Sequence, residues 1–118
     1  AQEDLRLGLV AVCEPGWHIY ALPLPREDGP LPTEVRVPAT EAYGLAGAIT
    51  EPVPVEVEDP NFAMLVRYHA DTVTFSVPLQ RLTSAAFVVQ GEVEYMVCND
   101  QTCLPPRVVP FSIPVPAR

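Results

Sequence analysis

The stretch DTVTFSVPL at residues 71–79 carries the clearest structural signal in this chain. Apolar side chains stand at every odd position from Val73 to Leu79, and hydroxyl side chains stand at the even positions from Thr72 to Ser76. Successive side chains of a strand point to opposite faces, so this alternation predicts a β-strand with one face against a hydrophobic core.

Similar segments extend outward from this stretch to both ends of the chain. Strands are predicted at residues 5–13, 17–22, 33–37, 54–58, 87–98 and 107–115, and residues 62–68 form a further apolar segment. Gly91 is a potential break in its strand, the prolines of the last strand suit a sheet edge, and residues 39–49 are expected to form a loop or a single helical turn. Roughly seven or eight short strands favour an immunoglobulin-like antiparallel β-sandwich, with a small closed barrel as the alternative.

Composition narrows the class of protein. The 118 residues include 48% hydrophobic residues and 15 prolines, which suits a single domain over residues 1–118 with little room for helices. The formal net charge is −8 and no basic patch exists, so nucleic acid is excluded as a partner. No apolar run is long enough to span a membrane. The polar, acidic start at residues 1–4 is no signal peptide, and it fits either cleavage after one or a domain boundary.

Two of the three cysteines enclose a short polar turn, CNDQTC at residues 98–103. If Cys98 and Cys103 pair, the closed loop is so small that the bond stabilises the fold by only about 2 kcal/mol. Redox chemistry is therefore the first hypothesis for this turn. Alternation in the preceding strand places Cys98 on the polar face with Glu92 and Glu94, and the turn returns Cys103 across from it. The expected bond is cross-strand and near the surface.

Residue chemistry alone leaves other interpretations open. The cysteine pair could be a structural clip in an adhesion or interaction domain. Zinc is disfavoured, because the Cys-x4-Cys spacing is unusual and no second pair exists. A periplasmic copper(I) module is a further alternative, in which Met64, Met96, His18 and His69 join the thiolates. Cys13 is in phase with the apolar face of the first strand and is expected to be an inert buried thiol.

Four motifs together resemble one known family. They are YMVCNDQTCLPP at residues 95–106, GWHIY at 16–20, PLPT at 30–33 and FSVPL at 75–79. The chain resembles the N-terminal periplasmic domain of the thiol:disulfide interchange protein DsbD family over residues 5–113. This resemblance implies an immunoglobulin-like protein-disulfide reductase domain in the periplasm, tethered to a membrane module. It implies no cofactor and no metal, only a redox-active Cys98–Cys103 disulfide.

The resemblance also implies partners. A thioredoxin-like module would donate electrons to this domain. Periplasmic disulfide isomerases or cytochrome c maturation thioredoxins would accept them. Cys103 would form the mixed disulfide with each partner, and Cys98 would resolve it.

Further residues would surround the cysteines: Phe62, Tyr20, His18 and Asp59. Phe62 matches an aromatic cap residue of the family, and a core position at the start of a strand is the equal alternative. Asp59 is a weaker match, because Pro60 and Asn61 stand beside it where relatives have carboxylates. Asp100 and Glu94 should disfavour a thiolate at either cysteine, which would make the reduced domain a slow nucleophile.

Overall fold

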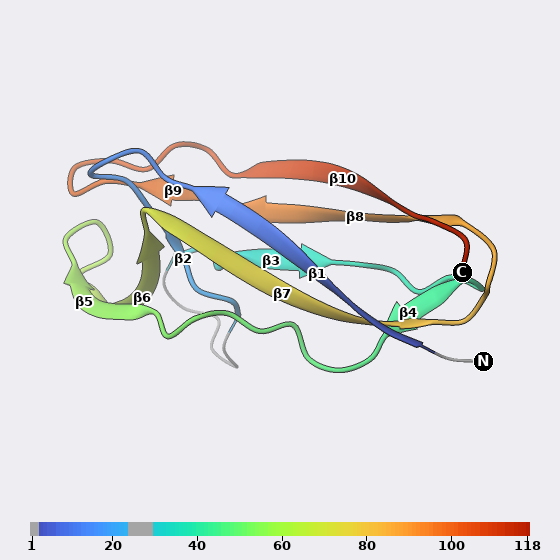
Figure 1. Ribbon diagram of the computed structural model, residues 1–118. Helices are drawn as coiled ribbons and strands as arrows, with labels where there is room; N and C mark the ends of the chain where they lie inside the picture. The colour runs from blue at the N-terminus through green and yellow to red at the C-terminus, as the bar shows by residue number, and fades with distance from the viewer. Residues whose placement is uncertain (1–2, 24–29) are drawn as a thin grey trace.

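The computed structural model describes residues 3–23 and 30–118, and within them the only regular elements are β-strands (Figure 1). No helix among these residues is long and apolar enough to cross a bilayer. The molecule is elongated, with extents of 50 × 26 × 20 Å.

The strands form three antiparallel sheets. The first contains β1 (Glu3–Val12), β7 (Thr72–Arg81) and β4 (Tyr43–Leu45), in that order. The second contains β10 (Arg107–Val115), β8 (Phe87–Tyr95) and β3 (Glu34–Arg36). The third contains β5 (Val55–Asp59), β6 (Met64–Ala70), β2 (His18–Tyr20) and β9 (Val97–Cys98). Figure 1 shows β5 and β6 at the end of the molecule opposite the C-terminus.

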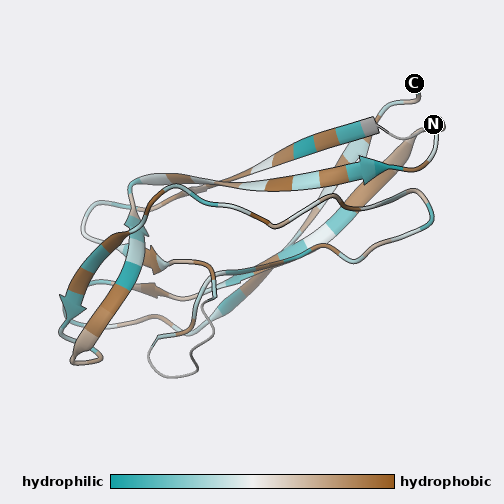
Figure 2. Ribbon diagram, turned by 90° about the horizontal axis from the view of Figure 1, so that it is seen from below, coloured by the Kyte–Doolittle hydropathy of each residue, from teal (hydrophilic) through white to brown (hydrophobic). Residues whose placement is uncertain are grey.

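The first two sheets face each other across a common core. Leu7 of β1, Leu79 of β7 and Val89 of β8 are buried in one hydrophobic cluster. Long strands show alternating hydrophobic and hydrophilic bands, as expected when one face of each sheet is buried (Figure 2). Burying each such side chain contributes about 1.5–3 kcal/mol. The predicted all-β, immunoglobulin-like sandwich is therefore confirmed. In the described part of the chain, β1 and β10 do not pair with each other, so the two sheets do not close into a barrel.

Several predicted elements are confirmed in detail. The four apolar side chains of residues 73–79 are all buried. The segment at 107–115 is β10, an edge strand that pairs with β8 alone among the described residues. The turn after β1 has Pro15 and Gly16 at its centre, with the Trp17 amide donating to the Glu14 carbonyl at 3.0 Å. Gly16 has φ +86°, the conformation that the third position of a type II turn requires.

Two local expectations were wrong. Residues 39–49 contain a strand, β4, because the backbone of this segment pairs with the second edge of β7. The predicted strand at 87–98 is not broken at Gly91 but after Tyr95. Gly91 instead allows a close approach, since a Cβ there would lie 2.5 Å from the Arg36 carbonyl oxygen and 2.6 Å from Cζ of Phe111.

Candidate redox site

The interruption between β8 and β9 moves Cys98 from one sheet to another. β8 pairs with β3 and β10, whereas Val97 and Cys98 pair with Ile19 and His18 of β2 in the third sheet. The alternation of β8 therefore does not continue to Cys98. The prediction that Cys98 lies on the polar face near the surface was wrong: it is 0% exposed. It lies in a buried cluster with Tyr20 and Val66. Five partly buried residues pack against this cluster: Phe62, Met64, Tyr68, Met96 and Cys103.

Cys98 and Cys103 form a disulfide. As the sequence predicted, they are cross-strand partners, here in an isolated antiparallel bridge. Their Cα atoms are 4.0 Å apart. The turn between them is closed by its own hydrogen bonds. Asn99 Oδ1 accepts from the amides of Gln101 and Thr102, both at 2.8 Å, and the Asn99 amide donates to the Thr102 carbonyl at 2.9 Å.

The two sulfur-bearing residues differ in access to solvent. Cys98 is fully buried, whereas Cys103 is only half-buried and is followed by the exposed Leu104. An incoming thiolate can therefore approach Cys103 more readily than Cys98.

A four-residue cap, residues 60–63, joins β5 to β6 beside the disulfide. Asp59 organises it: its Oδ1 accepts from the Asn61 amide at 2.8 Å, and its carbonyl accepts from the amides of Phe62 and Ala63 at 3.2 and 2.7 Å. Phe62 packs against the cluster that includes Cys98 and Cys103, and its ring lies 6.0 Å from the Tyr20 ring, edge to face. The cap position expected for Phe62 is thus where the structure places it.

A side-chain contact that the sequence did not reveal joins the cap to the cysteine turn. Asn61 Nδ2 donates to the Asn99 carbonyl at 2.8 Å. These two residues are 38 positions apart in the chain. Neither periodicity nor spacing signals such a pair, and only the packing of β9 near β5 and β6 brings it about.

A polar network lies in the same sheet as Cys98. The Tyr20 hydroxyl donates to Asp59 Oδ2 at 2.5 Å, and Asp59 is buried. His18 Nε2 lies 3.2 Å from the same hydroxyl and 3.7 Å from Asp59 Oδ2. Because the Tyr20 hydroxyl directs its hydrogen to Asp59, its oxygen accepts the hydrogen bond from His18 Nε2. Burial, together with the hydrogen bond to Asp59, raises the pKa of Tyr20, so it is a neutral donor over the physiological range.

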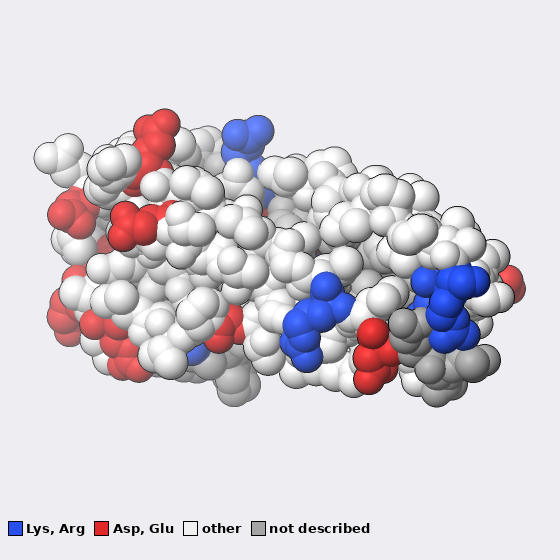
Figure 3. All heavy atoms as spheres, in the orientation of Figure 1, with Lys and Arg blue, Asp and Glu red and all other residues white. Residues whose placement is uncertain are grey.

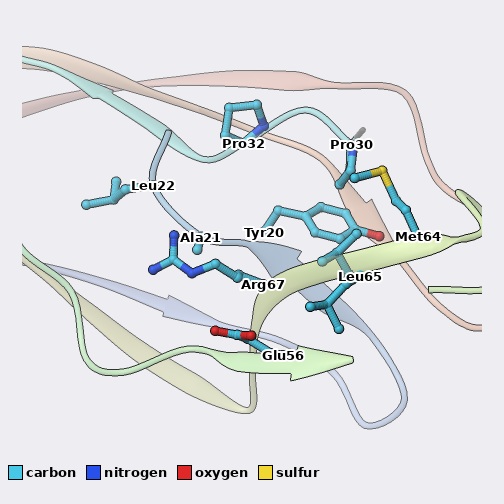
Figure 4. Close-up of a pocket in the computed structure, with 10 residues that line it drawn as sticks. Tyr20, Ala21, Leu22, Pro30, Pro32, Glu56, Met64, Leu65 and Arg67 are labelled. Atoms are coloured by element: carbon cyan, nitrogen blue, oxygen red, sulfur yellow. The ribbon is translucent and has the colours of Figure 1, made fainter. Parts of the chain in front are cut away.

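All four residues expected around the cysteines are therefore close to one another. His18 is the register partner of Cys98, Tyr20 and Phe62 belong to the cluster around the disulfide, and Asp59 bonds to Tyr20. Tyr20 and Met64 also line a cavity of about 290 Å³ beside this cluster (Figure 4). Tyr20 therefore lies between the disulfide cluster and this cavity.

The copper alternative finds only part of its ligand set together. Met64 and Met96 pack against the Cys98 cluster. His69 lies apart from it, because its ring contacts Phe75 and its Nε2 lies 2.8 Å from Glu51 Oε1. Among the described residues, no group of three or more His, Cys, Asp and Glu side chains is arranged to hold a metal ion.

Cys13 is half-buried rather than buried, which corrects the expectation for this thiol. It follows β1 directly, at the side of the sandwich that β1 and β10 leave open. Burial is the main cause that raises the pKa of Cys13, so its thiolate is disfavoured at neutral pH.

Acidic side chains gather at the end of the molecule that carries β5 and β6, whereas basic side chains lie mainly toward the middle and the opposite end (Figure 3). The redox site therefore lies in the more acidic part of a chain with a net charge of −8.

Comparison with known proteins identifies the family. No curated protein matches the chain by sequence. The solved structure of the Neisseria meningitidis DsbD N-terminal domain in the reduced form shares the fold, with a TM-score of 0.62 and 15% sequence identity. The match covers 93% of this chain and 77% of that one. The family described as thiol:disulfide interchange protein DsbD, N-terminal, matches residues 1–113. With nearly its whole length matched by this family, and with a disulfide at the expected cysteine pair, the chain belongs to the DsbD N-terminal domain family.

Proposed function

We propose that this domain is a protein-disulfide reductase module that carries two electrons between thioredoxin-like partners. A thioredoxin-like donor reduces the Cys98–Cys103 disulfide, and the reduced domain then reduces a partner's disulfide. We place it in the periplasm, joined to a membrane module of a larger protein, with a disulfide isomerase or a cytochrome c maturation thioredoxin as acceptor. The observation that carries the proposal is the asymmetry of the pair: Cys103 is half-buried and Cys98 is 0% exposed.

The exchange proceeds in two steps. In the reduced domain, the Cys103 thiolate attacks one sulfur of the partner's disulfide; the partner's other sulfur leaves and takes up a proton. Cys98 then loses its proton and attacks the Cys103 sulfur, which re-forms the internal disulfide and releases the partner's second thiolate to be protonated. Two electrons and two protons pass to the partner, and no cofactor takes part.

The hydrogen bonds of the turn support redox exchange over a structural clip. Asn99 already closes the turn through both its side chain and its backbone. The disulfide closes only a short loop, so its entropic contribution is near the low end for a crosslink, about 2 kcal/mol. A clip should have a reduction potential below about −300 mV, whereas an exchanging pair should lie above it.

A matched pair of variants tests the assignment of the two sulfurs. Cys98→Ser leaves the accessible Cys103, which should form a stable mixed disulfide with a thioredoxin-like protein. Cys103→Ser leaves only the buried Cys98 and should form little or none. Gel analysis under non-reducing conditions measures both. Equal trapping by the two variants, or trapping by Cys103→Ser alone, would refute the proposed roles.

A further inference from the structure

The sandwich is not closed along the side where β1 and β10, the edge strands of the first two sheets, face each other without pairing. A groove of about 720 Å³ runs between the edges of β1 and β10, with Phe75 and Val93 among the residues that line it. Inward-facing side chains in this half of the sandwich, such as Leu9 and Ala11, remain partly exposed, whereas Leu7 and Val89 further along are buried. Several apolar side chains that line the groove are therefore partly open to solvent, although Ile19 and Phe75, which also line it, are buried.

A polar atom beside the groove is also unsatisfied. Thr33 lines the groove and is fully buried, yet its hydroxyl has no hydrogen-bond partner among the described residues. Leaving a buried hydroxyl unpaired costs about 1–3 kcal/mol. Within residues 3–23 and 30–118, the groove thus combines partly exposed apolar side chains with one buried hydroxyl that has no partner.

Among the described residues, β1 pairs only with β7, so the edge that borders the groove has backbone groups with no strand partner. The Cys13 amide donates to the Asp71 carbonyl, so odd positions of β1 bond to β7. Backbone groups of neighbouring residues in a strand point to opposite sides. The even positions, which include Gly8, Val10 and Val12, therefore direct their amides and carbonyls to the open edge. None of them is proline, and Val10 and Val12 are 62% and 76% exposed.

The edge of β10 on the other side of the groove is blocked. The backbone of Gln90 bonds to the Tyr43 hydroxyl, so even positions of β8 point away from β10, and odd positions pair with it. The even positions of β10 then face the open edge. Two of them, Pro110 and Pro114, have no amide proton to donate. Prolines commonly protect an edge strand in this way. The two edges of the groove thus differ in their capacity to accept another strand.

We propose that the groove binds an extended segment of a partner polypeptide, which adds as a strand to the open edge of β1. The segment has apolar side chains at alternate positions, which fill the groove, and carries no net negative charge. Strand addition supplies affinity through main-chain hydrogen bonds and specificity through alternate side chains.

The location of the groove and the charge of the domain point to this occupant. Val97 and Leu104, which directly precede Cys98 and follow Cys103, also line the groove. A segment bound there is therefore continuous with the redox site, and this part of the proposal rests on the proposed function. The groove lining carries one residue of each charge, Glu14 and Arg107, but acidic side chains gather on this part of the molecule and the chain has a net charge of −8 (Figure 3). A neutral or basic segment is favoured over an acidic one.

The chain contains two reporters of occupancy. Trp17, its one tryptophan, and Cys13, its one cysteine outside the disulfide, both line the groove. The probe is a capped peptide with the sequence TVTFSV of residues 72–77, which already pairs with the other edge of β1, flanked by one arginine at each end. Its control has the same composition with the apolar residues placed together. The oxidised domain is titrated with each peptide.

We expect a saturable change in Trp17 emission with the alternating peptide and none with its control. With the peptide at about ten times its Kd, only about one tenth of the protein is free, so alkylation of Cys13 should slow about tenfold. Absence of both effects would overturn the proposal.

Edge variants test strand addition itself. Val10→Pro removes one outward amide while leaving the β1–β7 hydrogen bonds, and Val12→Pro does the same at a second position. Val10→Thr retains the amide and the branched shape. Both prolines should weaken binding of the peptide at least several-fold, and the threonine should not. Circular dichroism confirms that each variant is folded. Unchanged affinity in both proline variants would show that β1 accepts no strand.

Two other outcomes are informative. Sedimentation that shows a dimer of wild-type protein, converted to monomer by Val10→Pro, would assign the edge to a second copy of this chain and overturn the proposal. The peptide contains no cysteine and is tested on the oxidised domain, so its binding does not depend on electron transfer. If the peptide fails to bind but Cys98→Ser traps a mixed disulfide, only the proposed role of the groove is rejected. If the peptide binds but Cys98→Ser traps nothing, only the proposed redox function is rejected.

Discussion

The contact between Asn61 and Asn99 should hold the cap closed over the disulfide. Asn61→Ala removes the hydrogen bond from Nδ2 to the Asn99 carbonyl but retains the bond from the Asn61 amide to Asp59, so the turn of the cap is preserved. A neutral hydrogen bond of this kind contributes about 0.5–1.5 kcal/mol net. Its loss should raise the population of the open cap by a factor of about five, since 1 kcal/mol corresponds to that ratio.

The measurement is the rate of reduction of the Cys98–Cys103 disulfide by excess dithiothreitol, followed by quenching with an alkylating reagent and mass spectrometry. Asn61→Asp should accelerate it as well, because a carboxylate cannot donate to the carbonyl. The control is Gln101→Ala, which alters an exposed side chain in the turn between Cys98 and Cys103. This variant should react at the wild-type rate. If both Asn61 variants react as slowly as the wild type, the contact does not control access and the reasoning is wrong.

Three further predictions follow from the packing. Phe62→Ala should speed the reaction of the reduced domain with small disulfides, because the ring packs against the cluster that contains both cysteines; an unchanged rate in stopped-flow measurements would refute the shielding role. Tyr20 has a raised pKa in the fold, so the unfolded chain loses this proton first as pH rises above about 10, and stability should fall there by as much as about 1.4 kcal/mol per pH unit. Denaturant titrations should show a shallower alkaline loss for Tyr20→Phe, and an identical slope would contradict the assignment. Gly91→Ala should destabilise the fold by about 1–3 kcal/mol, because its Cβ would overlap the Arg36 carbonyl and the Phe111 ring; calorimetry showing a wild-type Tm would disprove that close approach.

Regular alternation explains why much of the fold was predictable. Apolar and polar side chains alternate without interruption over residues 71–79. This local pattern is enough to predict both the strand and the face of it that is buried. The prolines of β10 likewise identify an edge, because each removes a ladder donor. By contrast, residues 39–49 show no such alternation, and β4 forms there because β7 offers an unpaired edge.

Alternation in the sequence determined the class of fold, and the short spacing of Cys98 and Cys103 indicated that the two could pair across a turn. The residues around that pair were expected only from the resemblance to a known family. The fold class and the possible pairing depend on local periodicity or on a short turn, which neighbouring residues control. Only the tertiary structure decided that Cys98 is buried, that Asn61 bonds to Asn99, and that β1 keeps an open edge. Exposure and long-range contacts depend on segments that are distant in the chain. Because the chain leaves the second sheet after Tyr95 and β9 joins the third, Cys98 is buried where alternation along β8 predicts that it is exposed.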